Sequence, residues 1–374
     1  MKLFDVYPLF DVEPVKALGA KLWDKNGLEY LDLYGGHAVI SIGHGHPKYI
    51  ERITEQAHQI GFYSNAVINP LQQAYADQLA QSSGLTDFAL FLCSTGAEAI
   101  ENAIKVASFA TGRKKAIAME RAFHGRTSGA VAATDNAKIV APYNTGHAVE
   151  FIPLNDQKAL ADNMSDEVAA VIIEGCQGVA GIFEPAEGFL EKARALCDEY
   201  GAKLILDEVQ SGVGRTGAFF AFQHTSVKPD IITMAKGMGN GFPIAGVLIQ
   251  ESIQPWHGML GTTFGGNHLA CVAGLAVLEV IEEENLIENA ADLGKWLKSE
   301  LQRMAGIDSV RGKGLMLGLD LGQPVKTLRS NLLTKHQIFT GSAADPNTLR
   351  LLPPLNIQKA ELKIFLEALK KELE

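Results

Sequence analysis

The stretch PDIITMAKGMGNGFPIAG, residues 229–246, places a lysine directly after an apolar segment. Residues 231–235 are predicted to form a buried β-strand because the run is apolar and β-branched. Lys236 follows at once, and glycines at 237, 239 and 241 come after it. Glycine lets a backbone turn sharply and leaves space beside it. Burying a lone ammonium group at the end of a strand costs free energy. Lys236 is therefore the first candidate functional residue.

Similar apolar runs lie on both sides of this stretch and alternate with helical patterns. The runs are FALFLC, KKAIAME, VAAVIIEG, KLILDE, PDIITMAK and IAGVLIQ, separated by segments such as AEAIENAIKVASFA and FLEKARALCDEYG. Strands that are apolar on both faces and flanked by helices predict an α/β domain around a mostly parallel sheet. We place this domain at residues 48–270.

The two ends of the chain have a different pattern. AKLWDKNGLEYLDLYGG, from Ala20, predicts a β-hairpin that turns at Asn26-Gly27. The segment from Cys271 to Met304 is helical with a charged outer face, and VRGKGLMLGLDLG and a last helix from Gln358 follow it. We expect a smaller α+β domain built from residues 1–47 and 271–374.

Composition excludes several classes of protein. The 374 residues carry a formal net charge of -10, which argues against nucleic-acid or anionic-membrane partners. No apolar run is long enough to span a bilayer, and the first twenty residues do not resemble a secretory signal. The four cysteines are scattered without CxxC spacing, so we expect reduced thiols and a cytoplasmic location.

CSTGAEAIENAIKVA carries a predicted anion site. Thr95 and Glu98 have the spacing of a capping box, and apolar residues then recur at helical intervals. Gly96 and Ala97 occupy the first turn, where backbone N–H groups lack intrahelical acceptors. A small-residue helix start directly after a strand suits phosphate, although a capped helix that binds nothing has the same pattern.

The strand in AKLILDEVQSGVGRTG ends in two acids, Asp207 and Glu208, at the edge of the sheet where open α/β folds bind ligands. A nearly buried aspartate needs a cationic partner to stay ionised. That partner could be a metal, as in a nucleotide-hydrolysing enzyme, or the protonated nitrogen of a pyridine cofactor. The histidines of GHGHP, His44 and His46, have no third ligand nearby, so we expect a turn and no metal site.

Two further stretches hold candidate ligand-binding residues. Lys236 suits imine chemistry because desolvation depresses an amine pKa, although a single lysine is more often a surface residue. AFHGRTSGA supplies Phe123, which can stack on a planar ring, and Arg126, whose fork matches a carboxylate. LRLLPPL adds Arg350. We interpret His124 as a packed or orienting histidine.

Together these motifs resemble the class III, ornithine-type, aminotransferases that use pyridoxal phosphate, and most closely their acetylornithine branch. STGAEAIENAIKVA, FHGRT, LDEVQSGVGRTG, PDIITMAKGMGNGFPIAGV, GTTFGGNHLAC and LRLLPPL occur in the family's order. The resemblance implies fold-type I. Its large domain has a mostly parallel, seven-stranded sheet, and its small α+β domain is formed by both chain ends.

The resemblance also implies roles around the cofactor. Lys236 would form an imine with the cofactor aldehyde and shuttle a proton, and Asp207 would pair with the pyridinium nitrogen. Gly96 and Ala97 would bind the phosphate. Phe123 would stack on the ring, and Gln210 would bond near its O3′ oxygen.

The implied substrate contacts come from three further positions. Arg126 and Arg350 would bind carboxylates, and Thr262 would lie close to the substrate. Thr263 would reach the phosphate of the neighbouring subunit's cofactor, which implies a homodimer with shared active sites.

Two departures from the family pattern concern specificity. The family reads EPxQGEGG where this chain has EGCQGVAG, so the glutamate that pairs with the late arginine is Val179 here. Arg350 then lacks a local counter-ion, and a more anionic substrate such as N-succinylornithine becomes attractive. LYGGHAV, residues 33–39, replaces the common SGIAV and is expected to reshape the substrate entrance.

The predicted function is therefore transamination of N-acetylornithine or N-succinylornithine with 2-oxoglutarate, giving the semialdehyde and glutamate, in arginine biosynthesis. Within the family, an ornithine, 4-aminobutyrate or succinyldiaminopimelate aminotransferase or an aminomutase are the alternatives. A nucleotide hydrolase would need GxxxxGK[ST], which the chain lacks. A non-catalytic relative would be expected to lose Lys236 or Asp207, and both are present.

Overall fold

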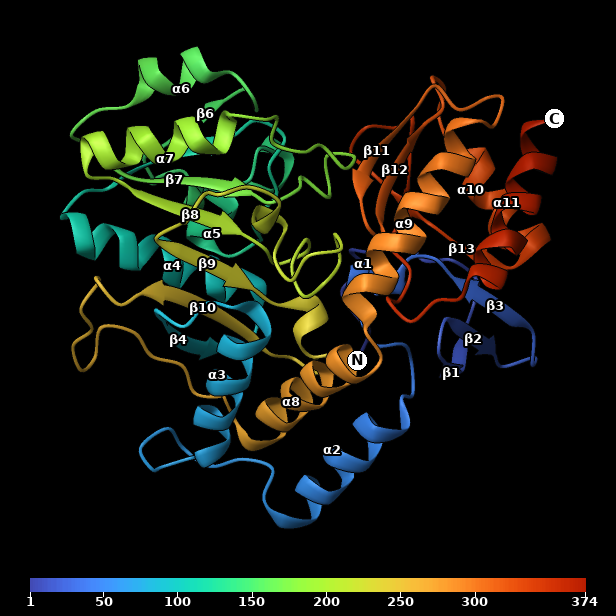
Figure 1. Ribbon diagram of the computed structural model, residues 1–374, viewed down its shortest axis with the longest axis horizontal. Coiled ribbons are helices and arrows are strands. Elements are labelled where there is room, and N and C mark those ends of the chain that lie inside the picture. Colours follow the sequence, from blue (N-terminus) through green and yellow to red (C-terminus); the bar gives the residue numbers. More distant parts are fainter.

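The computed structural model describes all residues, 1–374, and has a larger and a smaller part (Figure 1). The larger part is built on a seven-stranded sheet in the order β4-β10-β9-β8-β7-β5-β6, in which only β10 runs against the others. The strands are β4 (Phe88–Cys93), β5 (Lys115–Met119), β6 (Val149–Ile152), β7 (Val168–Glu174), β8 (Lys203–Asp207), β9 (Ile231–Met234) and β10 (Ala245–Gln250). The predicted α/β fold with a mostly parallel sheet is confirmed.

Six of the seven strands coincide with the apolar runs of the sequence, and β6 was missed. Its sequence, VEFI, is short and interrupted by the exposed Glu150. As an edge strand it pairs only with β5, so it does not need to be apolar on both faces.

The central strands are buried on both faces because helices cover each side of the sheet. Every residue of β7 is buried. Val171 and Ile173 belong to the larger hydrophobic core, which includes α7 (Phe189–Tyr200), whereas Ile172 belongs to a second core with α4 (Gly96–Thr111). The alternation of side chains along a strand thus divides the apolar residues between two cores.

Further helices surround this sheet. Below it in Figure 1, α8 packs against both α2 and α3. These helices are α2 (Pro47–Gln59), α3 (Pro70–Ser83) and α8 (His268–Glu283), and the short elements α5 (Ser128–Ala132), α6 (Gln157–Asn163), η1 (Ala137–Ile139), η2 (Pro142–Asn144), η3 (Ala221–His224) and η4 (Lys236–Met238) complete the larger part. No helix has the length and apolar character required to cross a membrane.

The smaller part joins the two ends of the chain, because β3 pairs in parallel with β13. Its sheets are ordered β1-β2-β3-β13 and β11-β12-β15-β14. Its elements are β1 (Pro14–Leu18), β2 (Lys21–Asp24), β3 (Glu29–Asp32), α9 (Leu286–Gln302), β11 (Ser309–Lys313), β12 (Met316–Asp320), α10 (Lys326–His336), β13 (Ile338–Phe339), β14 (Gly341–Ser342), β15 (Thr348–Leu351) and α11 (Lys359–Leu373). The predicted domain boundaries at 47 and 270 stay a prediction.

Two local expectations are refined by the structure. The hairpin of β2 and β3 forms, and its turn is closed by Asp24, whose carboxylate accepts hydrogen bonds from the backbone N–H groups of Asn26 and Leu28 at 2.9 Å each. The helical stretch from Cys271 to Met304 is divided into α8 and α9. Asn285, with φ +52°, makes the break.

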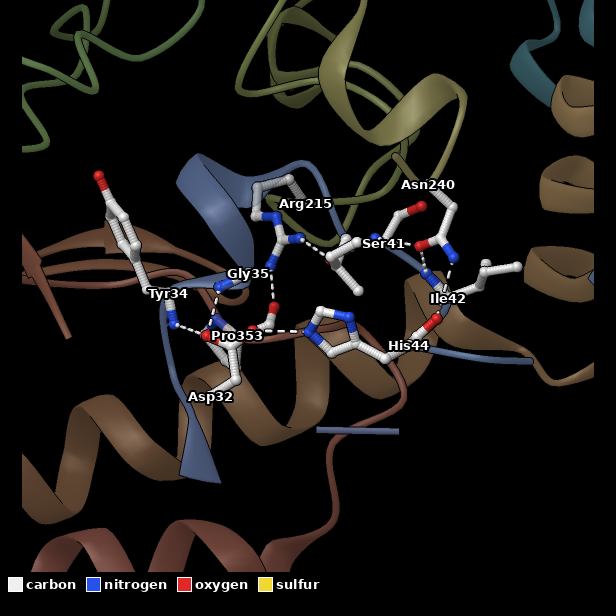
Figure 2. A network of polar contacts seen from close by, with 11 residues as sticks. Asp32, Tyr34, Gly35, Ser41, Ile42, His44, Arg215, Asn240 and Pro353 are labelled. Carbon is white, nitrogen blue, oxygen red and sulfur yellow. Dashed lines mark hydrogen bonds and ion pairs between the residues drawn. The ribbon is translucent and has the colours of Figure 1, made fainter. Parts of the chain in front are cut away.

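A buried arginine ties the larger part to both chain ends (Figure 2). Arg215 follows β8 in sequence, and its guanidinium donates to the carbonyls of Pro353, Leu315 (3.3 Å) and Ile40 (3.4 Å). Ile40 lies just after α1 (Gly35–Ala38), the short turn that Figure 1 shows between the two parts. The network fixes α1 beside the loop that carries Lys236, which α1 contacts through η4.

Candidate active site

A cavity of about 350 Å³ opens where the parallel strands end. β4, β5, β7, β8 and β9 all deliver the residues that follow their carboxyl ends to this edge, as expected for an open α/β sheet. The cavity is lined by Val39, Ser94, Thr95, Gly96, Ala97, Phe123, His124, Gly125, Glu174, Cys176, Val179, Asp207, Val209, Gln210, Ala235, Lys236, Gly241, Phe242, Pro243 and Ile244. Six of the ten predicted site residues therefore meet in a single cavity with a few polar groups on apolar walls.

Lys236 begins η4, one residue after the end of β9, and is held in an uncommon backbone conformation, with φ +42°. The hydroxyl of Ser41 donates to the carbonyl of the next residue, Gly237, at 2.7 Å and helps to fix this conformation. Burial lowers the pKa of Lys236, although the carboxylates of Asp207 and Glu174 act in the opposite direction. The side chain is thus an amine that becomes uncharged more easily than a surface lysine.

Asp207, the last residue of β8, is buried and already well bonded. Its Oδ1 accepts from the backbone N–H of Val209 at 2.9 Å and the hydroxyl of Thr233 at 3.2 Å. Its Oδ2 contacts Nδ1 of His124 at 2.7 Å. These partners keep the carboxylate in one orientation and in contact with a cationic or donor group, as a buried aspartate requires.

His124, predicted to be a packed or orienting histidine, is buried against Asp207. Burial lowers the pKa of its ring, but the hydrogen bond and the attraction of Asp207 outweigh burial, so the net pKa is raised. Its Nε2 atom is buried without a partner. The protonated ring is therefore favoured next to Asp207 and neutralises part of its charge.

Glu174, the last residue of β7, is a site residue that the sequence reasoning missed. It accepts hydrogen bonds from the backbone N–H groups of Phe123 at 2.9 Å and Gly178 at 3.2 Å. Burial raises its pKa to about 7. Its position at the end of an apolar strand is the same signal that identified Asp207, and that signal would have found it.

Glu208, by contrast, does not form a metal-binding pair with Asp207. Its carboxylate accepts from the hydroxyl of Ser211 at 2.6 Å and from the backbone N–H groups of Ala221 and Phe222 at 3.0 Å each. All its bonds go to the loop that follows β8. The two acids therefore serve different neighbours, and the arrangement offers no acidic metal-binding strand.

The start of α4 leaves backbone donors free at the cavity. The hydroxyl of Thr95 accepts from the N–H of Glu98 at 3.2 Å, and Glu98 reaches back to the N–H of Ser94 at 2.8 Å. In a regular capping box the Glu98 side chain would accept from the N–H of Thr95. Here it accepts from the N–H of Ser94, one residue earlier. The N–H groups of Gly96 and Ala97 have no acceptor in the protein, so they are available to an anion.

Phe123 and Gln210 complete the set of predicted cofactor contacts that line the cavity. The amide of Gln210 donates to the carbonyl of His37 at 3.1 Å, and its oxygen Oε1 is buried without a partner. Val179 lines the cavity at the position where the resemblance led us to expect a glutamate.

The predicted substrate residues lie outside the cavity lining. Arg350 is buried and donates to the carbonyls of Ser342 at 2.5 Å and Gly178 at 2.8 Å, and it makes no ion pair. Arg126 is exposed. Thr262 accepts a hydrogen bond from the backbone N–H of Gly265 at 3.3 Å, and Thr263 is exposed.

The histidines of GHGHP bond to carboxylates on different segments. Nε2 of His44 contacts Asp32 at 2.9 Å, and Nε2 of His46 contacts Glu284 at 2.9 Å. The His44 contact lies within the N-terminal segment, whereas the His46 contact joins that segment to the end of α8.

Comparisons with known proteins identify the family of this chain. The family model of the class III aminotransferases matches residues 6–373. The chain is 40% identical to the acetylornithine aminotransferase of Methanopyrus kandleri, over 96% of this chain and 93% of the relative. It is 39% identical to that of Bacillus subtilis, over 99% and 97% respectively. Its fold superimposes with a TM-score of 0.90 on the taurine:2-oxoglutarate aminotransferase of Bifidobacterium kashiwanohense, which was solved with pyridoxal phosphate and glutamate. The two chains are 28% identical, and the match covers 100% of this chain and 94% of that one.

The chain therefore belongs to the class III aminotransferases, the pyridoxal-phosphate-dependent family that its motifs resemble. The similarity covers nearly the whole of each acetylornithine aminotransferase named above.

Proposed function

We propose that the protein transfers the δ-amino group of an N-acylated ornithine to pyridoxal phosphate and then to 2-oxoglutarate. The products are the N-acylglutamate semialdehyde and glutamate, and the setting is arginine biosynthesis. The observation that carries this proposal is the cavity itself, in which an amine of lowered pKa, a buried carboxylate and free helix N–H groups converge.

These groups fit the cofactor of the family. The unpaired N–H groups of Gly96 and Ala97 suit its phosphate, and no side chain could be added at Gly96 without a clash, since a Cβ there would lie 2.8 Å from Val209. Phe123 would stack on the ring and Gln210 would bond near its O3′ oxygen. When bound, pyridoxal phosphate supplies an aldehyde that accepts the amino group and a protonated ring that stabilises negative charge on carbon.

The residues of the chain supply proton transfer and orientation. Nζ of Lys236, once uncharged, would take the proton from the substrate carbon that bears the amine. In the second half of the reaction it would deliver a proton to the carbon of 2-oxoglutarate that receives the amine. Asp207 would keep the ring nitrogen of the cofactor protonated, and His124 holds Asp207 in place through its 2.7 Å contact. The apolar walls exclude water from these transfers.

Carboxylate recognition is assigned to two arginines. Arg126 would bind one substrate carboxylate, Arg350 another, and Thr262 would lie close to the substrate. Arg350 is bonded only to carbonyls and Val179 offers no carboxylate, so the guanidinium keeps its full attraction for anions. This observation favours N-succinylornithine over N-acetylornithine as the amine donor.

Assembly and location complete the proposal. Thr263 is exposed here, as a residue that reaches a neighbouring subunit's cofactor should be. A homodimer with shared active sites would also cover exposed apolar side chains on the same loop, such as Trp256 and Phe264. Because the four cysteines are free and buried, a cytoplasmic enzyme is proposed.

A panel of amine donors tests the function. Glutamate formed from 2-oxoglutarate is measured with N-acetylornithine, N-succinylornithine, ornithine, 4-aminobutyrate and N-succinyldiaminopimelate. The proposal expects the highest kcat/KM for an N-acylornithine, with the succinyl form ahead. A clear preference for free ornithine or for 4-aminobutyrate would overturn it and favour another aminotransferase of the family.

A further inference from the structure

The turn α1 is left-handed, which is rare for L-amino acids. Four consecutive residues have positive φ: Gly35 at +55°, Gly36 at +55°, His37 at +68° and Ala38 at +65°. The N–H of Ala38 donates to the carbonyl of Tyr34 at 3.0 Å, as in one turn of helix. Glycine accepts this conformation freely, whereas each other residue costs about 1–2 kcal/mol. His37 and Ala38 are therefore strained.

The strain is maintained by supports at both ends of the turn (Figure 2). Before it, Oδ1 of Asp32 accepts from the N–H groups of Tyr34 at 3.0 Å and Gly35 at 2.8 Å. After it, Oδ1 of Asn240 accepts from the N–H of Ser41 at 2.9 Å. Ser41 also bonds to the residue after Lys236, so the turn is fixed relative to the amine. Backbone strain that is held in this way clusters at functional sites.

The turn presents a tyrosine–histidine pair next to Gln210, a residue that lines the cavity. The hydroxyl of Tyr34 forms a short hydrogen bond with Nδ1 of His37, and the two rings lie 4.7 Å apart. The carbonyl of His37 accepts from Gln210, which lines the cavity, and the His37 side chain is exposed. The guanidinium of Arg350 lies 6.0 Å from the centre of the Tyr34 ring.

The hydrogen bond sets which nitrogen of His37 can bind a ligand. The Tyr34 hydroxyl contacts both ring nitrogens of His37, and we assign it as the donor to Nδ1, the nearer of the two. A neutral ring then carries its proton on Nε2 and offers an N–H donor. Partial burial of the ring, and then the positive charges of Arg350 and Lys236, lower the pKa of His37 and favour the neutral ring. An N–H donor beside a guanidinium is suited to a carboxylate.

We propose that Tyr34 and His37 form, with Arg350, a carboxylate subsite that selects N-acylornithines whose acyl group ends in a second carboxylate. The proposal rests on the function proposed above and names the residues that determine specificity for the acyl group. Tyr34 acts by positioning the histidine ring, and Nε2 of His37 touches the substrate.

Two substitutions test the subsite without disturbing the turn. His37→Asn keeps a residue that tolerates positive φ, and Tyr34→Phe removes only the hydroxyl. For each variant, kcat and KM are measured with N-succinylornithine and N-acetylornithine. The ratio of the two kcat/KM values is expected to fall about tenfold, mainly through KM for the succinyl substrate, because one hydrogen bond to a charged group is lost.

Controls separate this effect from a general loss of structure. His58→Asn changes an exposed histidine on α2 and should leave both substrates unaffected. His37→Gly preserves the backbone without a side chain and should behave like His37→Asn. An unchanged ratio in active variants, or an equal loss for both substrates, would overturn the subsite and leave the proposed function intact. A wild-type enzyme that accepts neither N-acylornithine would overturn both.

Discussion

Lys236 combines an unusual φ, contact with the active-site cavity and a pKa lowered by burial. We predict that Lys236→Ala binds pyridoxal phosphate through the remaining contacts but loses turnover by about 10⁴-fold, because no other amine can move the proton. Glutamate formation from 2-oxoglutarate measures turnover. Absorption near the border of the visible and ultraviolet measures the covalent form of the cofactor, which borohydride should fix to Lys236 in the wild type only.

Lys228→Ala is the matched control, since Lys228 is exposed and paired with Asp87 on the surface. It should leave turnover and absorption unchanged. Turnover of Lys236→Ala within tenfold of the wild type would show that another group moves the proton.

At the same scale, some site residues could be predicted and others could not. Lys236, Asp207 and Gly96 carry local signals, because each ends a strand or begins a helix. His37 carries none, because its role follows from a left-handed turn and from Arg350, which lies more than 300 residues away in sequence.

Among the elements, α4 links a helix cap to ligand binding. Thr95→Ala removes the side chain that accepts from Glu98, and the loss of such a cap costs about 1 kcal/mol. We predict that this variant also binds pyridoxal phosphate more weakly, because the free N–H groups of the first turn lose their orientation. Urea unfolding of the cofactor-free protein and cofactor titration measure the two effects.

Asp156→Ala provides the comparison, because Asp156 caps α6 in the same way and does not line the cavity. Its free energy of unfolding should fall by a similar amount while cofactor affinity stays at the wild-type value. If both variants weaken cofactor binding equally, the effect comes from general stability and the assignment of α4 is wrong.

Elements were predictable where the periodicity of the sequence was strong. The buried strands are apolar on both faces, and their alternating side chains enter two cores, so the runs are unmistakable. β6 escaped prediction because an edge strand needs only one apolar face. The break at Asn285 escaped because asparagine inside a charged helical pattern gives little warning of a left-handed residue.

At the scale of the whole molecule, shared active sites can be tested by complementation. Lys236→Ala and Thr263→Glu should each be nearly inactive, the second because its carboxylate repels the neighbouring cofactor's phosphate. A mixed dimer has one site with both residues intact. In a two-fold dimer, co-expression in equal amounts should therefore restore about a quarter of wild-type activity. Activity equal to the mean of the two variants would contradict sharing across subunits.

The acid–base groups of the interior also act on the molecule as a whole. Burial raises the pKa of Glu174 and of Glu208 to about 7, from 4.5 for an exposed carboxyl. Between these values the unfolded chain releases protons that the folded protein keeps, so stability falls as pH rises. The raised pKa of His124 also makes stability fall as pH rises. The lowered pKa of His37 makes stability rise with pH. Because the residue is largely exposed, solvent screens its charge and this opposing contribution is small.

We therefore predict that the free energy of unfolding of the cofactor-free protein decreases from pH 5.5 to pH 8, as measured by urea unfolding. Glu174→Gln cannot ionise and should flatten this slope, even though its amide satisfies the N–H groups of Phe123 and Gly178 less well and lowers stability at pH 5.5. Glu167→Gln changes an exposed glutamate and should keep the wild-type slope. A stability that rises over this range would mean that Glu174 and Glu208 are ionised in the folded protein, held by their hydrogen bonds against the effect of burial.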